Sequence, residues 1–351
     1  MKKFYSIEIL RFLTSLSVLL FHYRHFFGPW NTTTSNKFEL IETNLPFYSI
    51  LENFYTYGFY GVHVFYTISG FVFAHIYLTI DEKVKFKNFF VNRFARLYPL
   101  HFATLFIVIA LQFICSIELD SFQVVFFNDF YHFMLQLFFI SAWGFEEGHS
   151  FNGPIWSISV EIAIYFIFFL LIGFLNKHKI YLTSAVIILL ILVAKFTNYE
   201  GLFLECARLF FSGVLVYFIC SRSISKYLLS LISIVLIVLA FVGNFKTFLF
   251  CPALVMLFIT IEPIITKSSV KTIFNNLGNL TYSLYLLHVP LQIFFILSLT
   301  FFGASDSLFL SKYFFIIFFL TIFTLAYCSF KYYEKPMNKI IRFKLNEKNK
   351  S

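Results

Sequence analysis

The chain has 351 residues, of which 59% are hydrophobic and only 13% are charged. Soluble domains are nearer to half apolar and a quarter charged, so this composition predicts a polytopic protein that contacts membrane lipids. The net charge of +9 would favour a nucleic-acid partner only with a solvated basic domain, for which so apolar a sequence leaves no room. All five cysteines fall in apolar segments, which suggests neither a disulfide framework nor a metal site.

The first apolar stretch, residues 4–27, is long enough to span a bilayer and contains Glu8, Arg11 and His22. Ionisable groups inside a membrane are costly and usually mark a functional path. Arg11 and His22 are eleven residues apart, which in a helix is three turns plus about 20°, so both lie on one face about 16 Å apart. Glu8 lies one turn before Arg11, within its reach. The alternative is that the arginine and the histidine only anchor the helix at the interface.

Further apolar segments of spanning length follow along the whole chain. They are residues 54–79, 96–117, 156–175, 180–196, 203–221, 227–243, 247–265, 278–301 and 312–333. With ten spans and both termini in the cytoplasm, most of the 27 Lys and Arg residues fall on the cytoplasmic side, in agreement with the positive-inside rule.

The stretch 122–145 is apolar but interrupted by Asn128, Asp129, His132 and Gln136. Counting it as an eleventh span would put every later basic loop outside, against the positive-inside rule. We therefore expect a re-entrant or interfacial helix on the outer side. The predicted fold is an all-α, polytopic membrane helix bundle of about ten transmembrane helices.

The sequence shows no internal repeat, no low-complexity linker and no second soluble domain. We expect a single transmembrane domain at residues 1–345, followed by a basic cytoplasmic tail at residues 346–351. In the second span, small residues permit close approach of a neighbouring helix. They are Gly58, Gly61, Ser69 and Gly70.

Two arginines, Arg93 and Arg96, lie one turn apart at the cytoplasmic mouth of the third span, behind a lysine-rich loop. Guanidinium groups bind phosphate oxygens in a two-pronged geometry, so this pair suits a phosphate-rich ligand. The alternative is that both arginines only fix the topology of the third span.

The segment SFNGPIWSISVEIAIY begins a span in which Glu161 lies about one turn inside. A buried carboxylate without an adjacent cation needs a partner from another helix, and His22 lies at a similar depth. Such a pair would orient the imidazole and raise its basicity, as a general base requires. A protonated structural glutamate is the alternative. Glu205 and Arg208, one turn apart, are expected to neutralise each other.

These stretches together resemble the acyltransferase-3 family of integral membrane acyltransferases. The matching pieces are Arg11 with ten residues before His22, FYTISGF at 65–71, RFARLYP at 93–99, WSISVE at 156–161, SLYLLHVP at 283–290 and EKP at 334–336. They follow the order of the family over nearly the whole chain, whereas 122–145 has no counterpart among them.

The resemblance implies transfer of an acyl group, most often acetyl from acetyl-CoA, onto extracytoplasmic or lipid-linked carbohydrates. It implies that His22 is the catalytic histidine with Arg11 as its companion, and that Arg93 and Arg96 contact the phosphates of CoA. Ser69 and Trp156, in two of the matching motifs, are the further candidates for substrate binding. His288, on an apolar helix, is interpreted as a core histidine.

From these features we expect a membrane-embedded O-acyltransferase, more specifically an O-acetyltransferase, in a bacterial cytoplasmic membrane. The expected partners are acyl-CoA as donor substrate and a cell-surface or lipid-linked glycan as acceptor, without a permanently bound cofactor. Direct transfer, an acyl-histidine relay and hand-off to a separate protein all stay open, as does the oligomeric state. The alternative functions are a glycolipid or anion transporter, for which inverted repeats are not found, and a structural scaffold.

Overall fold

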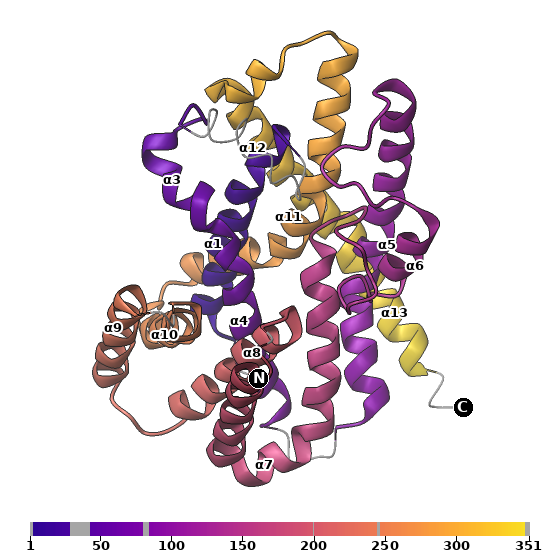
Figure 1. Cartoon of the computed structure of the whole chain (residues 1–351). Coiled ribbons are helices and arrows are strands. Elements are labelled where there is room, and N and C mark those ends of the chain that lie inside the picture. Colours follow the sequence, from indigo (N-terminus) through magenta and orange to yellow (C-terminus); the bar gives the residue numbers. More distant parts are fainter. Residues whose placement is uncertain (1–2, 29–42, 80–83, 199, 244–245, 348–351) are drawn as a thin grey trace. The chain divides into compact units, whose positions relative to one another are not determined.

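The computed structural model describes residues 3–28, 43–79, 84–198, 200–243 and 246–347, and in these ranges it is all-helical. Its helices are α1 (Tyr5–His22), α3 (Tyr48–Tyr57), α4 (Gly61–Tyr77), α5 (Phe86–Glu118), α6 (Phe130–Leu137), α7 (Ile155–Thr197), α8 (Leu202–Cys220), α9 (Lys226–Val242), α10 (Lys246–Ile261), α11 (Ser268–Phe301), α12 (Lys312–Ser329) and α13 (Lys335–Glu347) (Figure 1). Short 3₁₀ turns join some of them, and a π-helix (Phe330–Glu334) joins α12 to α13. The tail expected at 346–351 lies mostly outside the described residues.

Each of the ten predicted spans falls on a helix, which confirms the all-helical membrane fold. In the described part of the chain, 8 helical stretches are long and apolar enough to cross a bilayer. The difference from ten has two causes. Two predicted spans lie in the 43 residues of α7, where Lys179 interrupts the helix with φ 41° and ψ −115°. The other is α9, whose 17 residues fall just short of spanning length.

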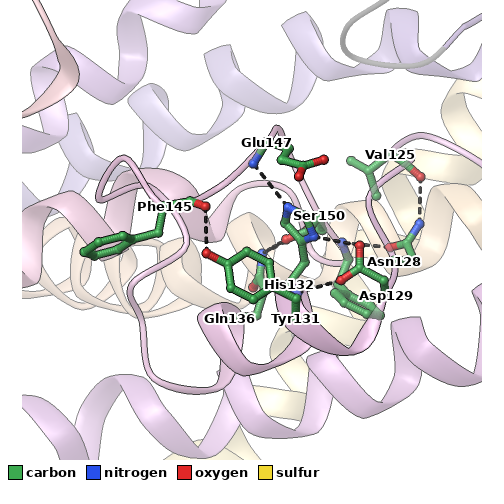
Figure 2. Close-up of polar contacts among 10 residues, drawn as sticks. Val125, Asn128, Asp129, Tyr131, His132, Gln136, Phe145, Glu147 and Ser150 are labelled. Carbon is green, nitrogen blue, oxygen red and sulfur yellow. Dashed lines mark hydrogen bonds and ion pairs between the residues drawn. The ribbon is translucent and has the colours of Figure 1, made fainter.

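The stretch 122–145 is not a span, as the charges of the later loops predict. Its helix, α6, has only 8 residues and is therefore about 12 Å long. Asp129 caps α6, because its side chain accepts a hydrogen bond from the main-chain N–H of His132. The His132 ring then joins α6 to the following loop: its Nδ1 lies 2.8 Å from Asp129 Oδ2, and Glu147 N–H donates to its Nε2 (Figure 2).

The chain forms two compact units, each built from three separate segments. Unit 1 contains residues 1–14, 60–86 and 160–279, and unit 2 contains residues 15–59, 87–159 and 280–351. Each helix that belongs to both units, α1 for example, therefore contributes its two ends to different units.

Unit 1 depends on a close crossing of α4 and α8. A Cβ atom built on Gly70 would lie 1.8 Å from the carbonyl oxygen of Phe210, and one built on Gly213 would lie 1.9 Å from that of Thr67. Only glycine permits the two backbones to approach so closely. The prediction that small residues in the second span allow close helix packing is thus confirmed at Gly70.

Unit 2 has its core between α5, α11 and the segment that precedes α7. Buried side chains from all three pack together: Leu105, Val108, Cys115, Val124, Val125, Phe151, Val289 and Ile293. The segment 122–145 therefore contributes to the core of unit 2, although none of the family motifs includes it.

Two of the prolines inside spanning helices, both in unit 2, leave main-chain carbonyls without their helical donor, because proline has no N–H. Pro99 in α5 exposes the carbonyl of Ala95, and Pro290 in α11 exposes that of Leu286. Side-chain amides of unit 2 replace the missing donors. Asn338 donates to Ala95 O at 3.1 Å, and Asn152 donates to Leu286 O at 3.0 Å. These amides satisfy the two exposed carbonyl groups in an apolar environment.

The predicted sidedness gives a labelling experiment. Ser121 and Ser225 are both exposed, and the positive-inside rule places them on opposite sides of the membrane. In a cysteine-free background, we expect Ser121→Cys to react with a membrane-impermeant maleimide in intact cells and Ser225→Cys to react only after permeabilisation. Labelling of position 225 alone in intact cells would contradict the predicted topology.

Candidate active site

Two histidines far apart in sequence meet inside unit 2. His22, the last residue of α1, has its Nδ1 2.7 Å from Nε2 of His288 on α11, and the ring centroids are 4.8 Å apart. Both side chains are buried, with exposed fractions of 6% and 1%. The main-chain carbonyl of His22 also accepts a hydrogen bond of 2.7 Å from Gln292 Nε2, so α11 holds both the ring and the backbone of His22.

The contacts of His288 determine which nitrogen of each neutral ring carries the proton. His288 Nδ1 lies 3.3 Å from the carbonyl oxygen of Leu284, which can only accept, so Nδ1–H donates to it. Nε2 of His288 is then an acceptor, and His22 Nδ1–H donates to it. The lone pair of His22 therefore lies on its Nε2. An imidazole held in this tautomer can accept a proton at Nε2 or attack an electrophile there.

The same face of α11 carries Tyr285, which contacts the start of α7. The Tyr285 hydroxyl donates to Pro154 O at 3.1 Å and lies 2.8 Å from Ser157 Oγ, which itself donates to Pro154 O at 3.1 Å. These three residues join the NGPIWS segment to the His22–His288 pair, because Tyr285 and His288 lie one turn apart on α11.

Further aromatic and imidazole rings surround the pair. His25, one turn after His22, has its ring centroid 5.4 Å from that of His22. His149 lies within electrostatic range of His22, and its ring centroid is 6.2 Å from that of Trp156. Burial lowers the pKa of His149 to about 4, so His149 is neutral at physiological pH. In the described part of the chain, these histidines are not arranged to hold a metal ion.

A second polar group in unit 2 brings three of the motifs together. The carboxylate of Glu334, at the end of the π-helix, accepts hydrogen bonds from Ser283 and, at 3.0 Å, from Ser329. Arg96 lies within electrostatic range of Glu334. Tyr282 donates to Leu97 O, so RFARLYP, SLYLLHVP and EKP converge at this place. A π-helix turn is frequent at functional sites.

A comparison with protein families shows to which family the chain belongs. The sequence model of a family described as an acyltransferase domain, acyltransferase 3, matches residues 4–333, which is nearly the whole chain. The chain belongs to the acyltransferase-3 family. No curated protein and no solved structure matches the chain. Together with the apolar spanning helices, the family makes the protein a multi-pass integral membrane acyltransferase and favours this function over a transporter.

Of the other residues predicted for the site of this acyltransferase, Arg93 lies in unit 2 with Arg96 and Trp156, and the rest lie in unit 1. Arg11 pairs with Glu8 at 3.2 Å, as their spacing predicts, and Lys3 lies 3.4 Å from the same carboxylate. Glu161 and Ser69 are half-buried on α7 and α4. Because His22 belongs to unit 2, the pairing of His22 with Glu161 stays a prediction. Nδ1 of His22 contacts the imidazole of His288, a partner that the sequence did not suggest.

In unit 1 of the acyltransferase, Glu205 has a nearer partner than Arg208, the residue expected to pair with it. Glu205 has its carboxylate 2.8 Å from His63 Nε2, whereas the guanidinium of Arg208 lies 3.7 Å from Glu200. The helical spacing of Glu205 and Arg208 permitted a local pair, but an imidazole from α4 lies closer to the carboxylate. The interaction between α4 and α8 therefore decided the partner.

Sequence reasoning missed three contacts of the candidate active site. It treated His288 as a core residue and gave no role to Gln292 or Asn152. The available signal was Pro290, because the carbonyl four residues before a helical proline must find a side-chain donor, and the family motif SLYLLHVP contains this proline together with His288.

Proposed function

We propose that this acyltransferase moves an acyl group, acetyl in the first instance, from acyl-CoA to a hydroxyl of a bacterial cell-surface or lipid-linked glycan at the cytoplasmic membrane. The observation that supports this most directly is the buried His22–His288 pair, which leaves the lone pair on His22 Nε2. No permanently bound cofactor is needed, because acyl-CoA supplies the activated thioester.

The reaction requires one proton to move from the acceptor to the departing sulfur. In direct transfer, His22 Nε2 takes the proton of the acceptor hydroxyl while the hydroxyl oxygen attacks the thioester carbonyl. The C–S bond of the thioester then breaks. The imidazolium then returns the proton to the thiolate, so the products are an ester and free CoA. In the relay variant, Nε2 attacks the thioester carbonyl first and CoA leaves as the thiolate. The acceptor hydroxyl then attacks the acyl-imidazolium, the bond between the acyl carbon and Nε2 breaks, and the hydroxyl proton passes to the CoA thiolate. Hand-off to a separate protein would replace the last step.

The His288 ring supports both variants in the same way. When His22 gains positive charge, its Nδ1–H bond to His288 Nε2 becomes charge-assisted and stronger, as in other base–orienter pairs. We assign Arg11 as a companion residue and Glu161 as a positioning residue for the base. Trp156 and Ser69 are assigned to substrate binding, with Trp156 offering a ring on which a sugar can stack.

The donor phosphates are assigned to Arg93 and Arg96. Arg93 is half-buried and Arg96 is exposed at the start of α5, beside the polar group around Glu334. Arg93→Ala and Arg96→Ala should each weaken CoA binding by about ten- to a hundredfold, because a charge-assisted phosphate contact contributes about 1.5–3 kcal/mol. The measurement is isothermal titration of detergent-solubilised protein with CoA.

Arg222→Ala provides the control, since Arg222 is an exposed arginine in a loop also predicted to be cytoplasmic. Its CoA affinity should match that of the unchanged protein. Equal affinity in all the variants would show that Arg93 and Arg96 only fix the topology.

The overall function is tested with membranes from cells that produce the chain. Radiolabelled acetyl-CoA is added together with envelope glycan from the source strain, and label released from glycan by mild alkali measures O-acetyl esters. We expect the glycan to become labelled only when the membranes contain the protein and radiolabelled acetyl-CoA is present. Transport of glycan without label incorporation would favour the transporter alternative.

A further inference from the structure

Four buried amide or imidazole acceptors in the described part of unit 2 have no donor, and one of them, Oε1 of Gln292, belongs to the residue that donates to His22 O. The other three are Nδ1 of His101, Oε1 of Gln136 and Oδ1 of Asn152, which we call the acceptor cluster. The exposed fractions of these side chains are 0%, 1% and 0%. Nearly all buried polar atoms in proteins have a partner, so these orphan acceptors call for an explanation.

The orientation of each group follows from the partner on its other side. Gln136 Nε2 donates to Ser150 O at 2.8 Å, and Asn152 Nδ2 donates to Leu286 O at 3.0 Å (Figure 2 shows Gln136 and Ser150). Main-chain carbonyls only accept, so each amide nitrogen must face its carbonyl and the amide oxygen is the atom left over. His101 Nε2 likewise donates to Gln136 O at 2.8 Å, which leaves a lone pair on Nδ1.

The members of the cluster are connected through their neighbours. His101 lies one turn before Thr104 on α5, and Asn152 Nδ2 also donates to Thr104 Oγ1 at 3.0 Å. Gln136 bonds to Ser150, two residues before Asn152. Hydrogen bonds thus link the cluster across α5, α6 and the segment before α7, and each atom it leaves without a donor is an acceptor.

The cluster is linked to the helix of the assigned phosphate site and to the helix of His288. Arg93 and Thr104 are eleven residues apart on α5, so they share a face about 16 Å apart along the axis. On α11, Leu286, which bonds to Asn152, is two residues from His288, the partner of His22. A ligand reaching from Arg93 to His22 would pass the acceptor cluster.

The chemistry of the cluster indicates what passes it. The ligand must donate several hydrogen bonds and be neutral there, because none of the described hydrogen-bond partners of the cluster is a carboxylate. The pantetheine arm of CoA carries two amide N–H groups and one hydroxyl, is uncharged, and has the length of about four residues of extended chain, roughly 14 Å. Resting on the function proposed above, we propose that His101, Gln136 and Asn152 bind the pantetheine arm of the acyl donor.

The experiment compares two ligands on the detergent-solubilised full-length protein. CoA carries nucleotide and arm, whereas adenosine 3′,5′-bisphosphate carries the nucleotide end without the arm. The ratio of their dissociation constants measures the contribution of pantetheine. In Gln136→Met and Asn152→Leu, we expect this ratio to fall by about three- to tenfold each, with bisphosphate affinity unchanged, because one hydrogen bond to the arm is lost.

Gln112→Met is the matched control. Gln112 is a buried amide on α5, the helix that carries His101. Its Nε2 donates to Gln123 O at 2.7 Å, and its Oε1 accepts from Gln123 N at 3.0 Å. Its substitution should leave the ratio unchanged even if it costs stability. If Asn152→Leu does not fold because Leu286 O loses its donor, Gln136→Met alone decides the matter.

Three results are distinguishable. A lower ratio in the cluster variants but not in Gln112→Met supports the proposal. An unchanged ratio in all variants, with CoA still binding, means that the acceptors hold only buried water and overturns the proposal while leaving the proposed function intact. Absence of CoA binding to the unchanged protein would overturn both.

Discussion

Replacing His22 by alanine is expected to reduce acyl transfer by roughly 10²–10⁴-fold, which is the contribution of a positioned general base. The reason is that the lone pair of the His22 ring lies on Nε2, while its Nδ1–H donates to His288. CoA binding should be retained, because the assigned phosphate contacts lie on α5. The measurements are initial rates of glycan acetylation at matched membrane abundance, together with the CoA dissociation constant.

His288 offers a graded version of this test. In His288→Gln the amide oxygen can still accept from His22 Nδ1–H, whereas in His288→Phe nothing can. We therefore expect the glutamine variant to keep a larger share of the rate than the phenylalanine variant, with both folding normally. A purely structural role of His288 would make the two variants lose rate in proportion to their loss of stability.

The exposed His178 gives the control, and His178→Ala should keep the full rate. Near-normal turnover in His22→Ala would place the base elsewhere and refute the central assignment. Glu161→Gln should lower the rate without abolishing it, since Glu161 is assigned a positioning role.

Replacing Gly70 by leucine is expected to prevent unit 1 from folding. A Cβ at this position would lie 1.8 Å from the carbonyl oxygen of Phe210, and main-chain atoms of α8 cannot move away as a flexible side chain could. Overpacking of this kind costs about 3 kcal/mol or more, a large part of the 5–15 kcal/mol that holds a typical domain together. Thermal unfolding and the yield of monodisperse protein in detergent measure the effect.

Gly173→Leu is the matched control, because a Cβ on Gly173 in α7 meets nothing within 4 Å. This variant should keep a normal melting temperature and yield. A Gly70→Leu protein as stable as Gly173→Leu would show that α4 and α8 do not cross as closely as described.

The sequence by itself determined the secondary-structure elements of this protein. In lipid the main chain must satisfy its own hydrogen bonds, so every long apolar segment has to be helical, and all ten predicted segments are. The exclusion of 122–145 as a span also came from the sequence, because loop charges constrain the number of crossings. Local pairs were predictable where helical spacing alone decides them, as for Glu8 and Arg11.

Only the tertiary structure decided which side chains meet between helices. Hydropathy does not encode the rotation of one apolar helix against another, so it could not show that His288 is the partner of His22, 266 residues away. Glu205 has a possible partner one turn away at Arg208, yet contacts His63 across the α4–α8 crossing. Asn152 donates to Leu286 O because Pro290 removed the helical donor and the fold brought an amide to that carbonyl. In each case the partner was selected by helix packing, which brings together residues distant in sequence.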